Sequence, residues 1–287
     1  MSHLQYIAKS HHLQWNIKQL SKICHQLYRD YCPAGLKHRR NVSLSKVSDE
    51  SLLVLLLLQA ELGIKSQRHF YRICQLFPCG HLLERSRFNR RARQLIWLVQ
   101  VIRQAMNAHI SPDTIVIIDS FPLPLCQSVR NYRVRIFKEV ADIGYNASKH
   151  LWFYRFKVHM LVTLSGYILN YVVTPASVHD IKAVHELLEE CDQPTILADL
   201  GYLSRELKND LEQKGYQLWT PLRQNMTGAK QHNHWKLLAM RRTIETRFSE
   251  LCALFDVEQT LTRSLTGLQL RIEQIILAYN LRYFEIN

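Results

Sequence analysis

Long apolar segments are absent from this sequence, and its longest uninterrupted apolar run covers only residues 52–58. A membrane-spanning helix needs about 20 such residues, so we expect no membrane partner. The N-terminus has no basic segment followed by an apolar core, and we therefore expect no secretory signal. The seven cysteines are scattered and form no C-x-x-C pair. This usage favours reduced thiols and a cytoplasmic protein.

Acidic residues are scarce in the first part of the chain. Residues 1–110 carry 17 Lys and Arg against 5 Asp and Glu, whereas residues 111–287 carry 20 against 19. The formal net charge of +13 therefore comes almost entirely from the first part. This asymmetry favours a polyanion-binding module joined to a near-neutral working module. A solvated basic surface is the alternative. The apolar content of 47% indicates a folded chain with a substantial core.

Residues 1–110 read as an all-helical, basic N-terminal domain. Apolar residues recur every three or four positions from Leu13 to Leu27, as on one face of a helix. A basic loop follows at residues 31–40. Ser48 is a candidate N-cap for a helix that runs to Leu62 and is apolar on nearly all sides. We expect that helix to be the buried centre of the domain.

A possible helix-turn-helix spans residues 48–77. Gly63 and Ser66 would end one helix and cap the next, and Pro78 would stop the second. The second helix would present Arg68 and Arg72 to phosphates and base edges. Any pair of helices joined by a short turn has the same pattern, so an ordinary helical hairpin is the alternative interpretation.

A further helix is predicted over residues 86–106, with Ser86 as its cap. Arg87, Arg90, Arg91 and Arg93 crowd its first two turns. These charges repel one another unless an anion such as DNA phosphate neutralises them. A solvated helix face is the alternative.

Residues 111–287 change to alternating strands and helices. Strands are predicted at 113–119, 153–164, 167–173, 194–199 and 216–220, and helices at 181–190, 204–214, 235–254 and 267–283. This order predicts an α/β fold: a mixed five-stranded sheet with flanking helices. In the ribonuclease H-like version of that fold, the first and fourth strands are parallel neighbours.

Three carboxylates carry the chemical prediction. Asp119 and Asp199 each close an apolar run, and Glu245 borders the buried face of the helix at 235–254. Carboxylates that converge without His or Cys ligands favour Mg²⁺ or Mn²⁺. Two such ions support in-line phosphoryl transfer. Taken singly, each residue has an ordinary explanation, since an Asp after a strand is often a turn former and a Glu beside Arg is often a surface ion pair.

Three motifs resemble those of DDE transposases of bacterial insertion sequences, in particular the 982 family of insertion sequences. They are Ile-Asp-Ser-Phe-Pro-Leu-Pro-Leu-Cys at 118–126, Ala-Asp-Leu-Gly-Tyr at 198–202, and Arg-Arg-Thr-Ile-Glu-Thr-Arg-Phe-Ser at 241–249. Residues 62–66, 86–91, 174–180 and 220–225 are also similar to that family. The resemblance extends over nearly the whole chain.

The resemblance implies a ribonuclease H-like catalytic domain at residues 111–287. It implies DNA cleavage and strand transfer at terminal inverted repeats, with two Mg²⁺ or Mn²⁺ ions per active site. It assigns catalysis and metal binding to Asp119, Asp199 and Glu245. It also implies a partner in double-stranded DNA at the transposon ends and target, a homodimer or larger assembly on that DNA, and a place at the bacterial nucleoid.

The chain departs from the pattern of many related transposases along the helix that bears Glu245. Those proteins carry Tyr, Arg, Glu and Lys at set spacing, whereas here Leu238 stands at the Tyr position and Cys252 at the Lys position. Arg241 matches, and Arg247 is the candidate substitute for the lysine. Asp180 matches the family too, and we interpret it as a helix cap rather than a site residue.

DNA-binding candidates occur in both parts of the chain. They are Arg68, Arg72, Arg87, Arg90, Arg91, Arg130, Arg133, Lys149, Arg241 and Arg247. Three aromatic residues follow shortly after Lys149: Trp152, Phe153 and Tyr154. Their rings could pack in the core or stack on a flipped base. Two other functions stay open: a catalytically silent DNA-binding repressor derived from a transposase, and a different ribonuclease H-like nuclease that acts on branched DNA.

Overall fold

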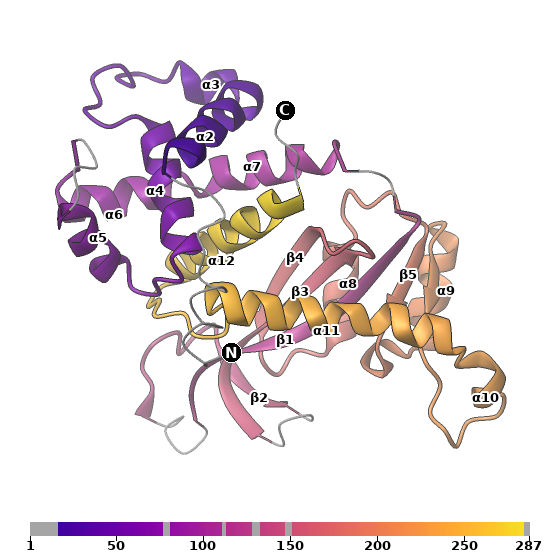
Figure 1. Ribbon diagram of the computed structural model, residues 1–287. Coiled ribbons are helices and arrows are strands. Elements are labelled where there is room, and N and C mark those ends of the chain that lie inside the picture. The colour runs from indigo at the N-terminus through magenta and orange to yellow at the C-terminus, as the bar shows by residue number, and fades with distance from the viewer. Residues whose placement is uncertain (1–16, 77–80, 111–112, 128–132, 147–150, 284–287) are drawn as a thin grey trace, which may run out of the picture. The chain divides into compact units, whose positions relative to one another are not determined.

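The structure, a computed structural model, describes residues 17–76, 81–110, 113–127, 133–146 and 151–283 (Figure 1). The chain divides into two compact units. Unit 1 comprises Met1–Ile110 and Leu251–Asn287, and unit 2 comprises Ser111–Glu250. The change of pattern near residue 110 therefore coincides with a boundary between units. The C-terminal 37 residues belong to unit 1 and not, as predicted, to the unit that begins at residue 111.

Every element described between residues 17 and 107 of unit 1 is a helix. These elements are α2 (Ile17–Tyr31), α3 (Ala34–Lys37), α4 (Asp49–Glu61), α5 (Gln67–Leu76), α6 (Arg85–Gln94) and α7 (Ile96–Asn107). Ser48 caps α4 as predicted, its hydroxyl accepting a hydrogen bond from the backbone N–H of Ser51 at 3.1 Å. Residues 52–58 are all buried, so α4 is central to unit 1.

The C-terminal helix α12 (Leu265–Asn280), followed by the short turn η4 (Leu281–Tyr283), completes unit 1 by packing against α4 and α7. Residues 270–280 of α12 are buried without interruption. Glu273 lies inside this packing, and its Oε2 atom accepts a hydrogen bond from Nε of Arg103 on α7 at 3.0 Å. A helix that is apolar on all sides is one that its neighbours bury completely.

The predicted helix over residues 86–106 is two helices in the structure. The helix is interrupted at Leu95, which is the C-cap of α6 and the N-cap of α7. The N-cap is Glu84 and not Ser86, because the Glu84 carboxylate accepts hydrogen bonds from the backbone N–H groups of Ser86 and Arg87. The turn before α5 agrees with the prediction: Gly63 has a φ of +61° and Ser66 accepts from His69 N–H at 3.2 Å.

Unit 2 is built on a mixed sheet of six strands. They are β1 (Ile115–Gln127), β2 (Asp142–Asn146), β3 (Leu151–Thr163), β4 (Ile168–Pro175), β5 (Thr195–Ala198) and β6 (Gln217–Trp219). Their order is β2-β3-β1-β5-β6, with β4 also paired to β3. β3 is antiparallel to β1, β2 and β4, whereas β5 is parallel to β1 and β6. The predicted α/β fold with a mixed sheet is confirmed.

The sheet has one strand more than predicted, because β2 lacks an apolar run. Its centre is Gly144, where an added Cβ would come within 2.4 Å of the Ala176 carbonyl oxygen. Glycine lets β2 approach the end of β4, although it weakens the strand signal in the sequence.

β1 also runs further than predicted, to Gln127 rather than Asp119. Past Ile118 it loses β5 as a partner but keeps β3. Pro122 and Pro124 lie in this part of β1. Proline cannot donate a backbone hydrogen bond and is tolerated where one side of a strand is unpaired.

Short helices and one long helix accompany the sheet of unit 2. They are η2 (Asp180–Ala183), α8 (Val184–Leu187), η3 (Leu200–Tyr202), α9 (Arg205–Gln213), α10 (Ala229–His232) and α11 (Trp235–Phe255). Ser204 caps α9 as predicted, but the helix expected at 181–190 is reduced to η2 and α8. Within unit 2, α11 packs on β1, where the rings of Phe248 and Phe121 have centroids 4.9 Å apart (Figure 1). Throughout the residues with assigned structure, no helix has the length and apolar character needed to cross a bilayer.

Candidate active site

Two aspartates lie at the same level of neighbouring parallel strands, where the pairing of β1 with β5 ends. The pairing of β1 with β5 runs from Ile115 opposite Thr195 to Ile118 opposite Ala198, and there it ends. Asp119 and Asp199 are the next residues on the two strands. Because parallel strands lie about 4.8 Å apart, in-register pairing delivers both residues to one edge of the pair.

Arg241 lies between these aspartates and Glu245. Its Nη1 atom is 3.7 Å from Oδ2 of Asp119 and 3.4 Å from Oδ1 of Asp199. Its Nη2 atom donates to Oε1 of Glu245 at 3.0 Å, across one turn of α11. The separation of the two aspartate oxygens therefore cannot exceed the sum of the first two distances, which is of the order found for ligands of one metal pair. The structure thus brings the three predicted carboxylates together around one guanidinium.

The position of Arg241 follows from the packing of α11. Ile244 is fully buried on the face of α11 that also carries Phe248. Residues three, four or seven apart share a helix face, so Arg241 lies one turn before Ile244 and two turns before Phe248. Its side chain is 12% exposed and that of Glu245 is 60% exposed. Glu245 is therefore the solvent-facing member of the group.

Burial raises the pKa of Asp119 to about 7. The nearby carboxylates of Asp199 and Asp180 contribute to this rise in pKa, while the backbone N–H of Ser120, which donates to Oδ1 at 2.7 Å, and the Arg241 guanidinium oppose it. Negative charge at this position is therefore only partly compensated by the protein. An additional cation would stabilise the ionised form of Asp119.

Asp180 is a fourth carboxylate near this group, and its predicted role as a helix cap is wrong. The cap of η2 is His179, whose Nδ1 faces the N–H of Ile181. The Asp180 carboxylate instead accepts a hydrogen bond from Nζ of Lys157 at 2.6 Å. The spacing of residues around 180 could not reveal this, because Lys157 comes from β3, 23 positions earlier.

Tyr202 is buried close enough to Asp180 and the two other aspartates to be affected by their charges. The side chain is 1% exposed, and its pKa is raised well above the ordinary value by burial and then by Asp180, Asp119 and Asp199. Gly201 beside it leaves room for Asp180, since an added Cβ would meet Oδ2 at 3.3 Å. The motif at 198–202 therefore contributes Gly201 and Tyr202 to the surroundings of the carboxylates, in addition to Asp199.

His159 is a further buried neighbour of Asp180. Its Nδ1 atom is 3.9 Å from Oδ1 of Asp180, and its Nε2 atom lies 2.9 Å from the hydroxyl of Thr174. Burial lowers the pKa of His159 to about 4, so the ring is neutral near pH 7. This histidine therefore supplies no positive charge to balance the carboxylates.

The donor set of the group fits a hard divalent cation. It consists of carboxylate oxygens, which Mg²⁺ and Mn²⁺ prefer. Within the described ranges, no three His, Cys, Asp or Glu side chains are already arranged as a metal cluster. The reason is visible at Arg241, whose guanidinium takes the central position toward which the three carboxylates point.

The DNA-binding candidates of unit 2 have different surroundings. Arg133 is exposed, whereas Arg241 is held by the carboxylates. Arg247 pairs with Glu250 on the next turn, Nη1 lying 3.0 Å from Oε2, so a DNA contact would have to compete with this ion pair. Arg130 and Lys149 lie outside the described residues.

The three aromatic residues at the start of β3 differ in exposure, so core packing and base stacking do not apply to all of them alike. Phe153 and Tyr154 are buried, whereas Trp152 is 55% exposed. The ring of Trp152 lies against Tyr145 of β2, with centroids 5.0 Å apart. Trp152 is therefore the member of this run that remains accessible to a base.

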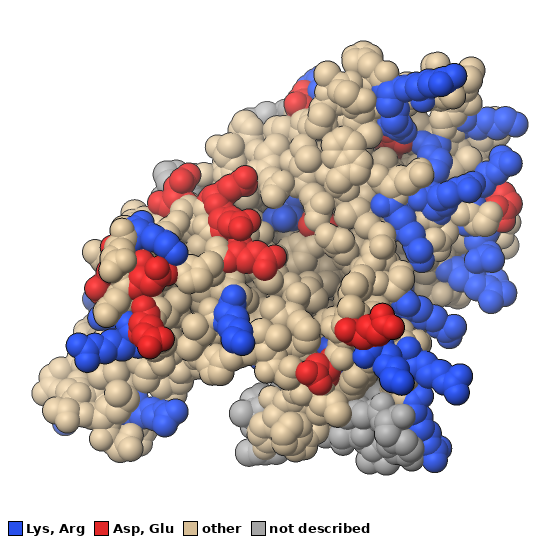
Figure 2. Space-filling model, turned by 180° about the vertical axis from the view of Figure 1, so that it is seen from behind, with Lys and Arg blue, Asp and Glu red and all other residues tan. Residues whose placement is uncertain are grey.

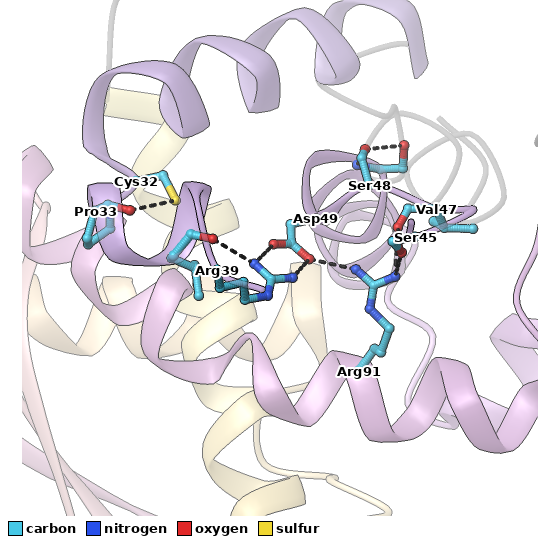
Figure 3. Close-up of polar contacts among 10 residues, drawn as sticks. Cys32, Pro33, Arg39, Ser45, Val47, Ser48, Asp49 and Arg91 are labelled. Atoms are coloured by element: carbon cyan, nitrogen blue, oxygen red, sulfur yellow. Dashed lines mark hydrogen bonds and ion pairs between the residues drawn. The ribbon is translucent and has the colours of Figure 1, made fainter. Parts of the chain in front are cut away.

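In unit 1, four of the five candidate arginines are exposed: Arg68, Arg72, Arg87 and Arg90. Arg91 is not. Its Nη2 atom is 2.7 Å from Oδ1 of Asp49, and its Nη1 atom donates to the carbonyl of Val47 at 2.7 Å and to the hydroxyl of Ser45 (Figure 3). This guanidinium is engaged by protein acceptors, so Arg91 leaves the set of DNA-binding candidates.

Comparison with known proteins identifies the region that holds the site. The family model described as "Transposase DDE domain" matches residues 109–265, more than half of the chain. No curated protein sequence matches the chain. Among solved structures, the chain is similar to one titled "Cryo-EM structure of piggyBac transposase synaptic complex with hairpin DNA (SNHP)". The identity is 12% and the TM-score 0.45, over 92% of this chain and 76% of that one.

Proposed function

The chain belongs to the DDE transposase family, and we propose that it cleaves DNA at the terminal inverted repeats of an insertion sequence and transfers the freed strand ends to a target. The observation that carries this proposal is the convergence of Asp119, Asp199 and Glu245 on one guanidinium inside the matched region. Double-stranded DNA is the substrate. A homodimer or larger assembly is required when two ends are joined.

The strand order supports assignment of unit 2 to the ribonuclease H-like folds. In the order β4-β3-β1-β5-β6, the first three strands are antiparallel and the last two run parallel to β1. Asp199 then follows β5, and Asp119 lies in β1 just past the end of the pairing between these two strands. This arrangement is what the sequence resemblance implied.

Asp119, Asp199 and Glu245 would hold two divalent cations, Mg²⁺ or Mn²⁺. Such a pair supplies stabilisation of the attacking and leaving oxygens of an in-line phosphoryl transfer. The donor chemistry of the three side chains and the incomplete compensation of Asp119 support this assignment.

The chain's own residues position and neutralise the group. Arg241 holds the three carboxylates close together and offsets part of their mutual repulsion. Lys157 does the same for Asp180 at 2.6 Å. The side chain of Asp119 is 18% exposed, so little water competes for its oxygens. Burial of the Asp119 carboxylate strengthens the electrostatic interactions that this side chain makes.

The proposal is tested with purified full-length protein, Mg²⁺ or Mn²⁺, and labelled duplexes that end in the inverted repeats flanking this reading frame. We expect nicking or joining at the repeat ends, and we expect Asp119→Asn to lower the rate by at least roughly 100-fold. Asp210→Asn is the matched control, because Asp210 is a solvent-exposed carboxylate on α9 paired with Lys214.

Three outcomes would contradict the proposal. Equal rates for Asp119→Asn and the native protein would remove the assigned site. Tight binding to repeat ends without cleavage in any divalent metal would favour a repressor. Preference for branched junctions over linear ends would favour a different nuclease.

A further inference from the structure

Unit 1 contains a polar cavity of about 220 Å³ at the start of α12. Residues of α4, α5 and α6 and of the segment before α12 line it. Four lining side chains are basic: Lys65, Arg93, Arg263 and Arg271. No acidic side chain lines the cavity in the described part of the chain. The wall is therefore strongly positive.

Arg271 is the buried member of this wall. It is 4% exposed, and its Nη2 atom donates to the carbonyl of Phe255 at 3.3 Å. Its Nη1 atom is buried and has no hydrogen-bond partner within the described ranges. Burial lowers the pKa of Arg271 to about 10, so the side chain remains charged at neutral pH. A buried cationic donor without an acceptor is unfavourable unless a ligand or water completes it.

Lys65 makes a different contribution, because it is already compensated. Its Nζ atom lies 3.2 Å from Oδ2 of Asp256 and donates to the side chain of Gln259 at 2.7 Å. The charges that remain for a ligand are those of Arg93, Arg263 and Arg271. Three arginines can supply charge-assisted, bidentate hydrogen bonds to one oxyanion.

The helix α12 adds to the positive potential of the cavity. It is 16 residues long and begins at the cavity, where Ser264 accepts a hydrogen bond from the N–H of Gly267 at 3.2 Å. Helix N-termini favour anions. Gly267 also keeps the entrance open, because an added Cβ would lie 3.1 Å from the Ser264 hydroxyl and 4.0 Å from Nη2 of Arg93.

A groove of about 560 Å³ lies along α6 beside the cavity. Asn89 and Arg93 line both, and Arg85 and Arg90 line the groove. Figure 2 shows Lys and Arg side chains gathered over the helices of unit 1, where few acidic side chains interrupt them. A charged path longer than one phosphate group fits a polyanion better than a small free anion.

We propose that the cavity binds a phosphate group of the DNA backbone, with Arg93, Arg263 and Arg271 as its donors and the groove along α6 receiving the neighbouring phosphate. Such a contact positions DNA without reading its sequence. The inference rests on the proposed function only in taking the polyanion to be DNA.

The test measures binding of a labelled duplex to the full-length protein in EDTA over a series of salt concentrations, so that cleavage plays no part. We expect Arg93→Gln and Arg263→Gln each to weaken binding by roughly tenfold. Each should also lower the slope of log affinity against log salt by about 1. Arg40→Gln is the matched control, since Arg40 is an exposed arginine of unit 1 that lines neither cavity.

A second arm uses inorganic phosphate alone and follows the thermal unfolding midpoint. Phosphate should raise the midpoint of the native protein and of Arg40→Gln, but not that of Arg93→Gln or Arg263→Gln. Circular dichroism checks that each variant is folded. Arg271→Lys, which keeps the buried charge, should retain part of the phosphate effect.

The two arms separate the possible failures. Native affinity and salt slope in both Arg→Gln variants would overturn the proposal, as would equal phosphate stabilisation of all variants. Phosphate stabilisation lost in the variants without any change in DNA binding would assign the cavity to a free anion and overturn the DNA assignment. A chain that binds no DNA at all would instead defeat the proposed function.

Discussion

Two groups of charged side chains, one in each unit, show opposite balances of charge. In unit 1, Asp49 has a side chain 1% exposed and two arginine partners, Arg39 and Arg91, at 2.8 and 2.7 Å (Figure 3). In unit 2, three carboxylates share Arg241, and Asp180 has Lys157. The first group has more cations than anions and needs no ligand. The second lacks positive charge, which is the condition for binding a metal ion.

The largest effect on stability is expected at Asp49. Asp49→Ala leaves Arg39 and Arg91 without their shared acceptor, and we expect the free energy of unfolding to fall by about 2 to 4 kcal/mol. Urea denaturation followed by circular dichroism measures the change. Asp30→Ala is the control, because the pair of Asp30 with Arg29 is on the surface. Equal effects of the two changes would show that the Asp49 group is not structural.

Asp119→Asn should change stability in the opposite direction in metal-free protein. The folded-state pKa of Asp119 is raised to about 7 from 3.8, so its protonated form favours folding below about pH 4 and this contribution is lost as the pH rises through 7. Asparagine stays neutral throughout. We expect the variant to be more stable by about 1 to 3 kcal/mol at pH 8, with a gap that shrinks toward pH 5.

The measurement is urea denaturation in EDTA at pH 5, 6, 7 and 8. Asp210→Asn should show no such pH-dependent gain, because Asp210 is exposed. A gap that is constant over this range, or that widens toward acid, would contradict the electrostatic account of Asp119.

Arg241→Gln tests whether the guanidinium of Arg241 occupies the position that a metal ion would take. Removing the guanidinium leaves three carboxylates facing one another, so the metal-free protein should lose about 1 kcal/mol. Mn²⁺ should then raise its unfolding midpoint more than that of the native protein. Thermal unfolding with and without Mn²⁺ measures both effects. A smaller Mn²⁺ effect in the variant would mean that Arg241 helps to hold the metal ion.

The smallest effect is expected for exposed ion pairs of unit 2. Lys214→Gln breaks the pair with Asp210, whose two side chains are 51% and 42% exposed. We expect the free energy of unfolding to change by less than about 0.5 kcal/mol. A larger change would show that charge balance in unit 2 matters beyond the carboxylate group.

Local signals predicted much of the fold. The caps at Ser48, Ser66 and Ser204 are where their side chains indicated, because a cap depends on residues within one turn. The apolar runs ending near Asp119 and Asp199 indicated parallel neighbours, and β1 and β5 are paired there. β2 was missed because a glycine that permits close approach reads as the absence of a strand.

Three carboxylates and Arg241 of the candidate site were named from the sequence, whereas the pairing of Asp180 with Lys157 was not. Asp119, Asp199 and Glu245 sit in motifs readable along the chain. The pairing of Lys157 with Asp180 joins β3 to a segment 23 residues later, and no local pattern reports it. The helix cap at Ser86 was wrong for a local reason, because the carboxylate of Glu84 accepts hydrogen bonds from the backbone N–H groups of Ser86 and Arg87.

The sequence by itself determined the helical and α/β halves of the chain, the basic character of the first half, and the motifs that bear three acidic residues. These depend on periodicity, caps and composition, which act over a few residues. Only the tertiary structure decided that α12 completes unit 1, that Arg91 is held by Asp49, and that Arg241 lies among the carboxylates. Burial and charge pairing join residues distant in sequence, so their outcome depends on how the elements pack.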